Sequence, residues 1–329
     1  MQKLIEAFPD HLSDGLRIGK NAVLQKGKAE IKNVLIEGLG GSGIAGTIIQ
    51  NIYYYKTNVP IVVNKNYQTP GFVNENTFFI SSSYSGNTEE SIFATNEAIE
   101  KKATISCITS GGELKNIALA NHLNFIEIPG GNPPRAMLGY SFVQQLFLLR
   151  HYGIIESGFE KDLENAIVLL KKESENIKTE AKKVAQFLFN KLPIIYCDAT
   201  YEGVALRFRQ QINENSKMLC WHQVIPEMNH NELLAWKNKR EDVAVIFLRN
   251  ISDFSRNKKR MEISIKIISE FCDSIHEIWS LGESDIEKSL YFIHLCDWAS
   301  IYLADMQNID ATEIRVLNYL KEELFKFKS

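Results

Sequence analysis

The sequence lacks the features of a membrane-spanning, secreted or metal-binding protein. No stretch approaches about 18 predominantly apolar residues, and the first residues lack the apolar core of a signal peptide. The five cysteines form no CxxC pair, and most lie in apolar surroundings such as Ile195-Tyr196-Cys197, which favours inert core thiols. Neither an HExxH motif nor a close histidine pair is present. We therefore predict a cytoplasmic protein with no membrane segment and no metal site.

A strong charge of one sign is also missing. The chain has 37 Lys and Arg against 40 Asp and Glu, a formal net charge of −3, so we expect no nucleic-acid partner. Hydrophobic content of 45% and charged content of 23% are ordinary for a globular protein. With 329 residues, the chain is long enough for two domains of about 150 residues, each with its own core.

The first half of the chain alternates short apolar strands with helical patterns. This alternation is typical of an α/β fold in which helices cover both faces of a parallel sheet. The predicted strands are residues 34–36, 60–63, 77–81, 104–109 and 125–128, and the main helices are 88–102, 113–121 and 137–152.

The second half repeats the same plan after one long amphipathic helix over residues 162–189. The predicted strands are 193–197, 243–248 and 276–279, and the helices are 200–213, 256–271, 287–306 and 312–325. We place the domain boundary between residues 155 and 156. The turn over residues 198–203 is acidic and bulky and would repel a phosphate, so we expect one active site per chain, near the junction of the halves.

Two turns rich in small and hydroxyl residues carry the main functional signal. Gly38-Leu39-Gly40-Gly41-Ser42-Gly43 follows the first strand, and Ser83-Tyr84-Ser85-Gly86-Asn87-Thr88 follows the third; each opens onto a helix. Turns of this kind present free backbone N–H groups at the positive end of a helix dipole, where an anion is stabilised. Hydroxyl groups add donors without adding charge. Together the turns predict a phosphate cradle.

Simpler explanations fit these turns less well. Gly38-x-Gly40-x-x-Gly43 matches the dinucleotide-binding pattern, but that pattern also needs an acidic residue at the end of the second strand, which here reads Val63-Asn64-Lys65-Asn66. A Walker loop is excluded because no Gly-Lys-Ser/Thr occurs. The second turn has more hydroxyls than a helix cap requires, and two such turns exceed what tight packing alone explains.

Three further side chains are suited to chemistry. Arg135 follows the stiff Pro133-Pro134 pair, which favours a positioned cation where negative charge develops. Glu214 stands at the end of a helix. His230 lies between two asparagines in a polar loop, where it suits acid–base work near neutral pH, whereas His222 beside Trp221 is interpreted as a packing residue.

The order of the motifs resembles a known family. Gly-x-Gly-Gly-Ser-Gly, Ser-Tyr-Ser-Gly-Asn-Thr-Glu, Pro-Pro-Arg, Asn-Glu-Asn-x-Lys and Pro-Glu-x-Asn-His-Asn-Glu look like the bifunctional phosphoglucose/phosphomannose isomerases of the sugar isomerase (SIS) domain superfamily. The resemblance runs from about residue 30 to the C-terminal helix. It implies two SIS-type αβα sandwich domains with parallel sheets, over residues 1–155 and 156–329. The implied reaction is aldose–ketose isomerisation of glucose 6-phosphate, and of mannose 6-phosphate, with fructose 6-phosphate, without a cofactor.

The resemblance also implies a role for each site residue. Glu214 would be the base that moves a proton between C1 and C2, a carboxylate with no competing cation, and Arg135 would stabilise the enediolate. His230, contributed by the neighbouring subunit of a homodimer, would open the sugar ring together with Lys321. The sugar phosphate would be bound by residues of the two turns: Gly41, Ser42, Ser83, Ser85 and Thr88.

The chain departs from the family pattern at one place, and two alternative functions remain to be considered. The family often has Asp-Pro-x-Pro before its C-terminal helix, where this chain has Asp310-Ala311-Thr312-Glu313, so the approach to Lys321 is less fixed. A non-catalytic sugar-phosphate regulator usually carries a DNA-binding domain, and only about thirty residues precede the first strand. An arabinose-phosphate isomerase would share the cradle but not the second-half motifs.

Overall fold

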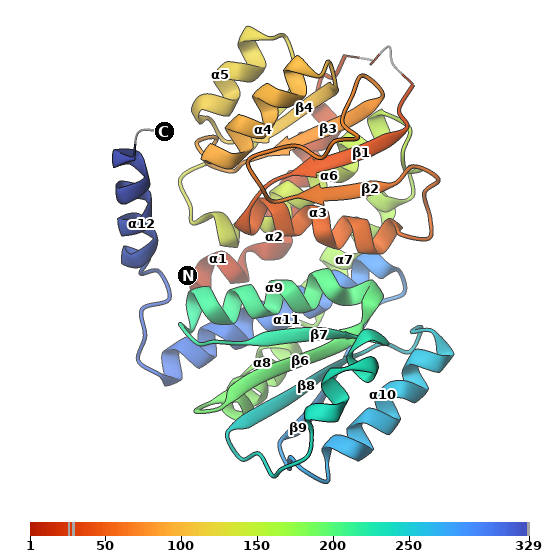
Figure 1. The fold of residues 1–329 in the computed structure, drawn as a ribbon, viewed down its shortest axis with the longest axis vertical. Coiled ribbons are helices and arrows are strands. Elements are labelled where there is room, and N and C mark those ends of the chain that lie inside the picture. Colours follow the sequence, from red (N-terminus) through yellow and green to blue (C-terminus); the bar gives the residue numbers. More distant parts are fainter. Residues whose placement is uncertain (26, 28–29, 328–329) are drawn as a thin grey trace.

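The computed structural model describes residues 1–25, 27 and 30–327, and it shows two parallel β-sheets flanked by helices (Figure 1). The first sheet has the order β2-β1-β3-β4-β5. Its strands are β1 (Asn33–Glu37), β2 (Ile61–Asn64), β3 (Thr77–Ser82), β4 (Thr104–Thr109) and β5 (Asn124–Glu127). The helices of this half are α1 (Gln2–Glu6), α2 (Phe8–Asn21), α3 (Gly40–Tyr53), α4 (Glu89–Glu100), α5 (Gly112–Ala120) and α6 (Leu138–His151).

The second sheet is also parallel, with the order β7-β6-β8-β9. Its strands are β6 (Leu192–Asp198), β7 (Trp221–Ile225), β8 (Val243–Arg249) and β9 (Ile275–Trp279). The accompanying helices are α7 (Phe159–Lys172), α8 (Ser174–Leu188), α9 (Glu202–Asn215), α10 (Ser255–Ile268), α11 (Asp285–Met306) and α12 (Arg315–Lys326). The predicted α/β class is confirmed, and every predicted strand is present with ends within one residue of the prediction.

The topology of the first sheet places the two hydroxyl-rich turns side by side. Strand β1 pairs with β2 on one side and with β3 on the other, so Leu35 lies between Val62 and Phe79. The chain therefore changes winding direction at β1. In open parallel sheets, ligands bind at the carboxyl edge where the strand order reverses. The turns after β1 and β3 both lie at this edge.

A tight contact between helices joins the halves. Helix α3 of the first half packs against α9 of the second, and one hydrophobic cluster extends through both. Gly203 permits the approach, because a Cβ atom there would lie 2.9 Å from the backbone N and Cα atoms of Ile48. The Gly203 N–H also donates to Asn51 Oδ1 at 2.7 Å. Residues at the start of α3 and along α9 are thus held in a fixed relation.

Helices α1 and α2 were not predicted, and one further helix and one strand differ from the prediction. The helix expected over residues 162–189 is two helices that meet at Glu173. Apolar side chains of both pack on α11, and the spacing from Leu170 to Ile177 continues the same seven-residue repeat, which conceals the break. Strand β7 was not predicted, because it is an edge strand whose half-buried Trp-His-Gln-Val-Ile sequence has no continuous apolar run.

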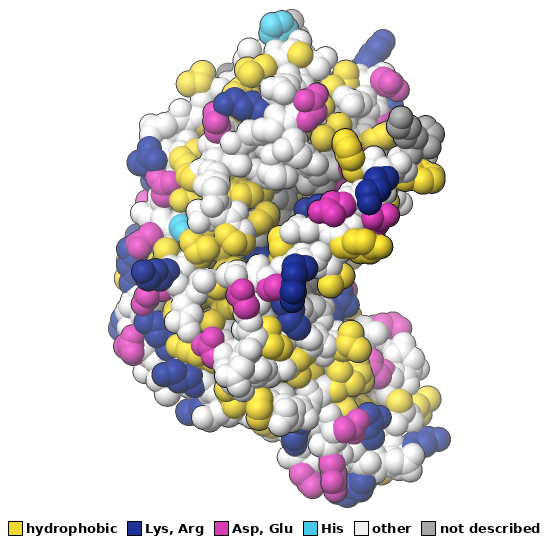
Figure 2. Space-filling model, turned by 90° about the vertical axis from the view of Figure 1, so that its left-hand side faces the viewer, with side chains coloured by type: hydrophobic (Ala, Val, Ile, Leu, Met, Phe, Trp, Pro, Cys, Tyr) yellow, Lys and Arg dark blue, Asp and Glu magenta, His cyan; other side chains and the backbone are white. Residues whose placement is uncertain are grey.

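The burial of the cysteines and the mixed charges on the surface agree with what the sequence predicts. Four cysteines are buried and Cys220 is half-buried, and all five are free thiols. Burial raises the pKa of Cys107 to about 12, which confirms an inert core thiol there. No helix within residues 1–25, 27 and 30–327 is long and apolar enough to cross a bilayer. Figure 2 shows Lys and Arg interspersed with Asp and Glu over one face, which is hollowed at mid-height on its right.

Candidate active site

The turn between β1 and α3 is built so that other backbone segments can approach it closely. A Cβ atom at Gly43 would lie 1.9 Å from the Gly38 carbonyl oxygen, so the tight turn requires glycine. A Cβ atom at Gly41 would lie 2.7 Å from the Pro134 carbonyl oxygen and 3.2 Å from Arg135 Cα. The absence of a side chain at Gly41 therefore lets the Pro-Pro-Arg loop lie directly against this turn.

The turn between β3 and α4 is bonded to the first one. Ser42 Oγ accepts a hydrogen bond from the Tyr84 N–H at 3.0 Å, and Ser83 Oγ donates to Thr88 Oγ1 at 2.9 Å. Ser42 and Ser83 are buried, whereas Ser85 is exposed and its Oγ accepts from the Asn87 N–H at 3.2 Å. Thr88 is the N-cap of α4. Of the five residues predicted to hold a phosphate, Gly41 and Ser42 thus lie in the first turn of α3, and Ser83, Ser85 and Thr88 lie in the adjoining turn before α4.

The loop that carries Arg135 is fixed against the second turn. The Asn132 N–H donates to Tyr84 Oη at 3.1 Å, and residues Pro134–Ala136 form a 3-10 helix, η1. The Arg135 side chain is only 4% exposed, and all three of its nitrogens donate hydrogen bonds. The acceptors are Asn215 Oδ1 at 2.8 Å, Glu214 Oε1 at 2.8 Å and the Ala311 carbonyl at 2.5 Å. Arg135 is therefore a buried, positioned cation and not a surface residue.

Glu214 lies in the last turn of α9, with its side chain 35% exposed. Its ion pair with Arg135 corrects the expectation of a carboxylate with no competing cation. The close packing of α9 on α3 and the approach of the Pro-Pro-Arg loop to Gly41 bring the two charges together. The pair places a potential base and a fixed cation at one point, as a reaction that moves a proton and builds up oxygen charge requires.

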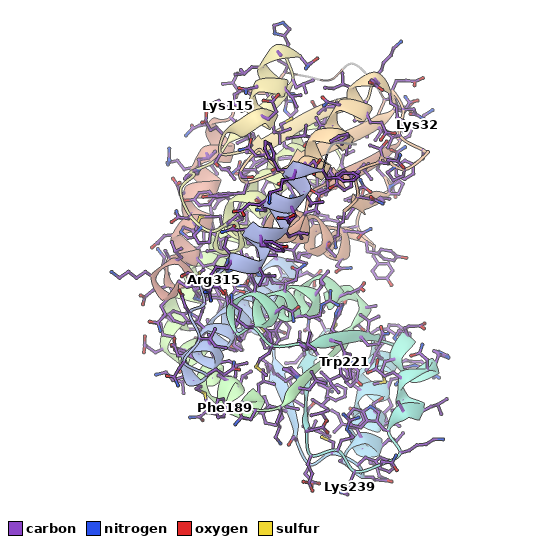
Figure 3. All side chains as sticks on the ribbon, turned by 60° about the vertical axis from the view of Figure 1, so that its left-hand side comes forward. Lys32, Lys115, Phe189, Trp221, Lys239 and Arg315 are labelled. Carbon is purple, nitrogen blue, oxygen red and sulfur yellow. The ribbon has the colours of Figure 1, made fainter. Side chains whose placement is uncertain are left out.

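Both members of this pair line a pocket of about 400 Å³ at the junction of the halves. One wall is a face of α9 on which Arg207, Gln211 and Glu214 follow one another at intervals of three or four residues. Helical periodicity, counted back from Glu214, would have predicted the first two as pocket residues. A second wall comes from the start of α12, which rises from Arg315 beside the N-terminal half (Figure 3). The lining residues are Gly40, Gly41, Arg135, Arg207, Gln210, Gln211, Asn213, Glu214, Lys217, Glu313, Ile314, Val316 and Leu317.

A buried ion pair supports the Arg135 loop from beneath. Arg207 is 2% exposed and donates to the Asp297 carboxylate from Nε at 3.1 Å and from Nη2 at 2.8 Å. Its Nη2 also donates to the Arg135 carbonyl oxygen at 2.6 Å. Arg207 was not predicted as a site residue from the sequence, because its contacts reach α11 and η1, which are far apart along the chain.

Six predicted site residues do not line this pocket: the hydroxyl residues Ser42, Ser83, Ser85 and Thr88 of the two turns, and His230 and Lys321. His230 is exposed in the 3-10 helix η3 (Glu227–His230), which follows the far end of β7 (Figure 1). Strand β7 begins near the end of α9 that carries Glu214, and its five residues span roughly 17 Å at about 3.3 Å each. Within one chain, His230 therefore lies away from Glu214. Lys321 is exposed on α12, one turn beyond the pocket residue Leu317.

His222 fits the interpretation as a packing residue. It is half-buried, and burial, followed by the positive charges of Arg209 and Lys65, lowers its pKa to about 4. The ring is therefore neutral near pH 7 and cannot act as a general acid there.

Asn64 occupies the position where a dinucleotide site would need an acid, and its amide donates to buried Glu37 at 2.6 Å.

The fold defines the class of protein. Residues 177–324 match the family of bacterial phospho-glucose isomerase C-terminal SIS domains. The C-terminal domain of a glucosamine-fructose-6-phosphate aminotransferase from Francisella tularensis has the same fold, with a TM-score of 0.73 at 14% identity and coverage of 94% of this chain and 96% of that one. A tagatose-6-phosphate ketose/aldose isomerase from Escherichia coli is similar in fold, with a TM-score of 0.65 at 13% identity and coverage of 93% and 92%. The chain is thus an SIS-type protein.

Sequence similarity then identifies the family. A bifunctional phosphoglucose/phosphomannose isomerase from Caldicellulosiruptor bescii is 36% identical over 332 residues, covering 98% of each chain. A second, from Aquifex aeolicus, is 34% identical and covers 90% of this chain and 91% of its own. The chain belongs to the family of bifunctional phosphoglucose/phosphomannose isomerases, as the motifs predicted.

Proposed function

We propose that the protein interconverts glucose 6-phosphate and mannose 6-phosphate with fructose 6-phosphate. The observation that carries this proposal is the Arg135–Glu214 pair, 2.8 Å between Nη1 and Oε1, in a pocket whose wall includes Gly41 of the first phosphate turn. The pair lies in a chain 36% identical to a relative described as acting on both aldose phosphates.

In the proposed mechanism, the two turns bind the phosphate and the pocket binds the reacting end of the open-chain sugar. Gly41, Ser42, Ser83, Ser85 and Thr88 anchor the phosphate, and this binding energy orients C1 and C2. Glu214 takes the proton from C2 and returns it to C1. Arg135 stabilises the negative charge that develops on oxygen in the enediolate. Glucose and mannose phosphates differ only at C2, so both give the same intermediate.

We further propose that the active unit is a homodimer. His230 is exposed and lies away from Glu214 within its own chain, which supports a role in the neighbouring subunit's site. Helix α12, with Lys321, has no buried residue. Its exposed apolar side chains support packing on a second copy, and they are Val316, Leu317, Tyr319, Leu320, Leu324 and Phe325. We also propose the domain boundary between residues 155 and 156, and a cytoplasmic location consistent with five free thiols.

The test of the proposed function is fructose 6-phosphate formation from each aldose phosphate, measured in the presence of a chelator. We expect both substrates to be converted. Binding of glucose 6-phosphate without turnover would favour the non-catalytic regulator, and conversion of an arabinose phosphate alone would favour the arabinose-phosphate isomerase. A D-glucosamine-6-phosphate 4-epimerase from Sulfolobus acidocaldarius is 25% identical, so glucosamine 6-phosphate belongs in the same assay.

A further inference from the structure

We propose that Lys217 is a positioning residue that, together with Arg135, holds residues 307–314 as a strap and so sets the place of α12 against the pocket. The proposal rests on the proposed function only in taking this pocket as the active site. Lys217 is the last residue of the Asn-Glu-Asn-x-Lys motif and takes no part in the proposed proton transfer.

The side chain of Lys217 connects two segments. The residue lies just beyond the end of α9, and its φ of 55° is the left-handed conformation that commonly terminates a helix. In this conformation Nζ donates to two carbonyl oxygens, those of Glu214 and Glu313, each at 2.6 Å. One ammonium group therefore connects the last turn of α9 to the segment that precedes α12.

Two more bonds fasten the same strap. Arg135 Nη2 donates to the Ala311 carbonyl at 2.5 Å, and Gln307 Nε2 donates to the Ser216 carbonyl at 3.2 Å. The carbonyls of residues 311 and 313 are thus each bound by a cation that itself lines the pocket. Hydrogen bonds from charged donors are stronger than neutral ones. The bonds from Arg135 and Lys217 therefore contribute more than the bond from the Gln307 side chain.

Within one chain, the position of α12 depends on this strap. No residue of α12 is buried, and the helix stands apart from the body of the molecule (Figure 1). Its contact with the site is through Ile314, just before the helix, and through Val316 and Leu317. Freeing the strap would therefore remove one wall of the pocket and displace Lys321, which lies one turn beyond Leu317.

The strap also accounts for the missing prolines. The Asp310 carboxylate accepts from the Thr312 N–H at 2.8 Å and from Thr312 Oγ1 at 2.6 Å, which forms a local turn. Among the described residues, the Ala311 N–H has no hydrogen-bond acceptor, so a proline there would remove no bond. In this chain the cations supply the stiffness that a proline after the aspartate would give. Ala311→Pro is therefore the matched rescue for the loss of Lys217.

The experiment measures strap opening by hydrogen exchange of peptides covering residues 307–318, and turnover with each aldose phosphate. The variants are Lys217→Gln, Ala311→Pro and their combination. The control is Lys258→Gln, which removes an ammonium group bonded to the Ile251 carbonyl at 2.8 Å, away from the pocket lining. We expect Lys217→Gln to exchange at least about tenfold faster in these peptides alone and to lose at least about tenfold in kcat, and Lys258→Gln to change neither.

The combined variant decides whether Lys217 acts through the strap. If Ala311→Pro alone behaves as wild type, adding it to Lys217→Gln should slow exchange and recover most of kcat. Unchanged exchange in Lys217→Gln would overturn the proposal. Lost kcat that the proline does not recover would also overturn it, and would favour direct contact of Lys217 with substrate. Exchange needs no substrate, so a wild-type protein without isomerase activity would refute the proposed function while leaving the strap testable.

Discussion

Replacing Glu214 by Gln should lower kcat strongly while changing the stability of the folded protein only slightly. The amide keeps the shape of the side chain and an oxygen that can accept from Arg135 Nη1, now 2.8 Å from Glu214 Oε1. It cannot take the C2 proton. A lone general base contributes about a hundredfold to ten-thousandfold, so we expect kcat to fall about a thousandfold, equivalent to about 4 kcal/mol on the barrier.

The effect of the same change on folding should be small. Glu214 is 35% exposed, and Arg135 keeps its bonds to Asn215 and Ala311. A hydrogen bond to a charged group contributes about 1 kcal/mol more than a neutral one, so unfolding by urea should show a loss of about 1 kcal/mol.

An ion pair of similar exposure in the second half provides the control. Arg249 and Glu277 are 6% and 36% exposed, against 4% and 35% for Arg135 and Glu214, and they do not line the pocket. Glu277→Gln should lower stability by a similar amount and leave kcat within about twofold. If folded Glu214→Gln keeps more than a tenth of wild-type kcat, or if Glu277→Gln loses as much, Glu214 is not the base.

Four further outcomes test other parts of the site. Arg135→Lys should lower kcat at least about thirtyfold with less change in KM, because an ammonium group cannot span three separate acceptors; wild-type turnover would refute this. Ser85→Ala should weaken inhibition by inorganic phosphate by about 1.5–3 kcal/mol, and an unchanged inhibition constant would exclude it from the cradle. Glu214→Gln and His230→Ala subunits refolded together should recover about a quarter of wild-type activity, whereas no recovery in proven mixed dimers would place His230 in its own subunit's site. Burial raises the pKa of Glu37 to about 8, so the unfolded chain binds fewer protons above pH 4.5 and stability should fall by up to about 1.4 kcal/mol per pH unit between pH 4.5 and 8. Urea titrations of Glu37→Gln should lack this slope, and an equal slope in both proteins would show that Glu37 is not its source.

Local sequence was sufficient wherever one segment makes a feature by itself. Buried parallel strands read as continuous apolar runs, and for this reason residues 243–248 were predicted to within one residue of β8. The glycine and hydroxyl turns are also local, since backbone geometry and helix N-termini determine where an anion can bind. The break between α7 and α8 and the edge strand β7 escaped prediction because neither changes the apolar pattern of its own segment.

The tertiary structure decided which of these features meet. Motif order places Arg135 and Glu214 in one family pattern. The packing of α3 on α9 and the approach of the Pro-Pro-Arg loop to Gly41 bring the two side chains to 2.8 Å and make the Glu214 carboxylate a partner of the cation. The same holds for Lys217 and Ala311, which form hydrogen bonds to segments that are distant in the sequence. A sequence encodes each element through short-range sterics and periodicity. The distances between charges from different elements arise only when the shared core is packed, and those distances decide the chemistry.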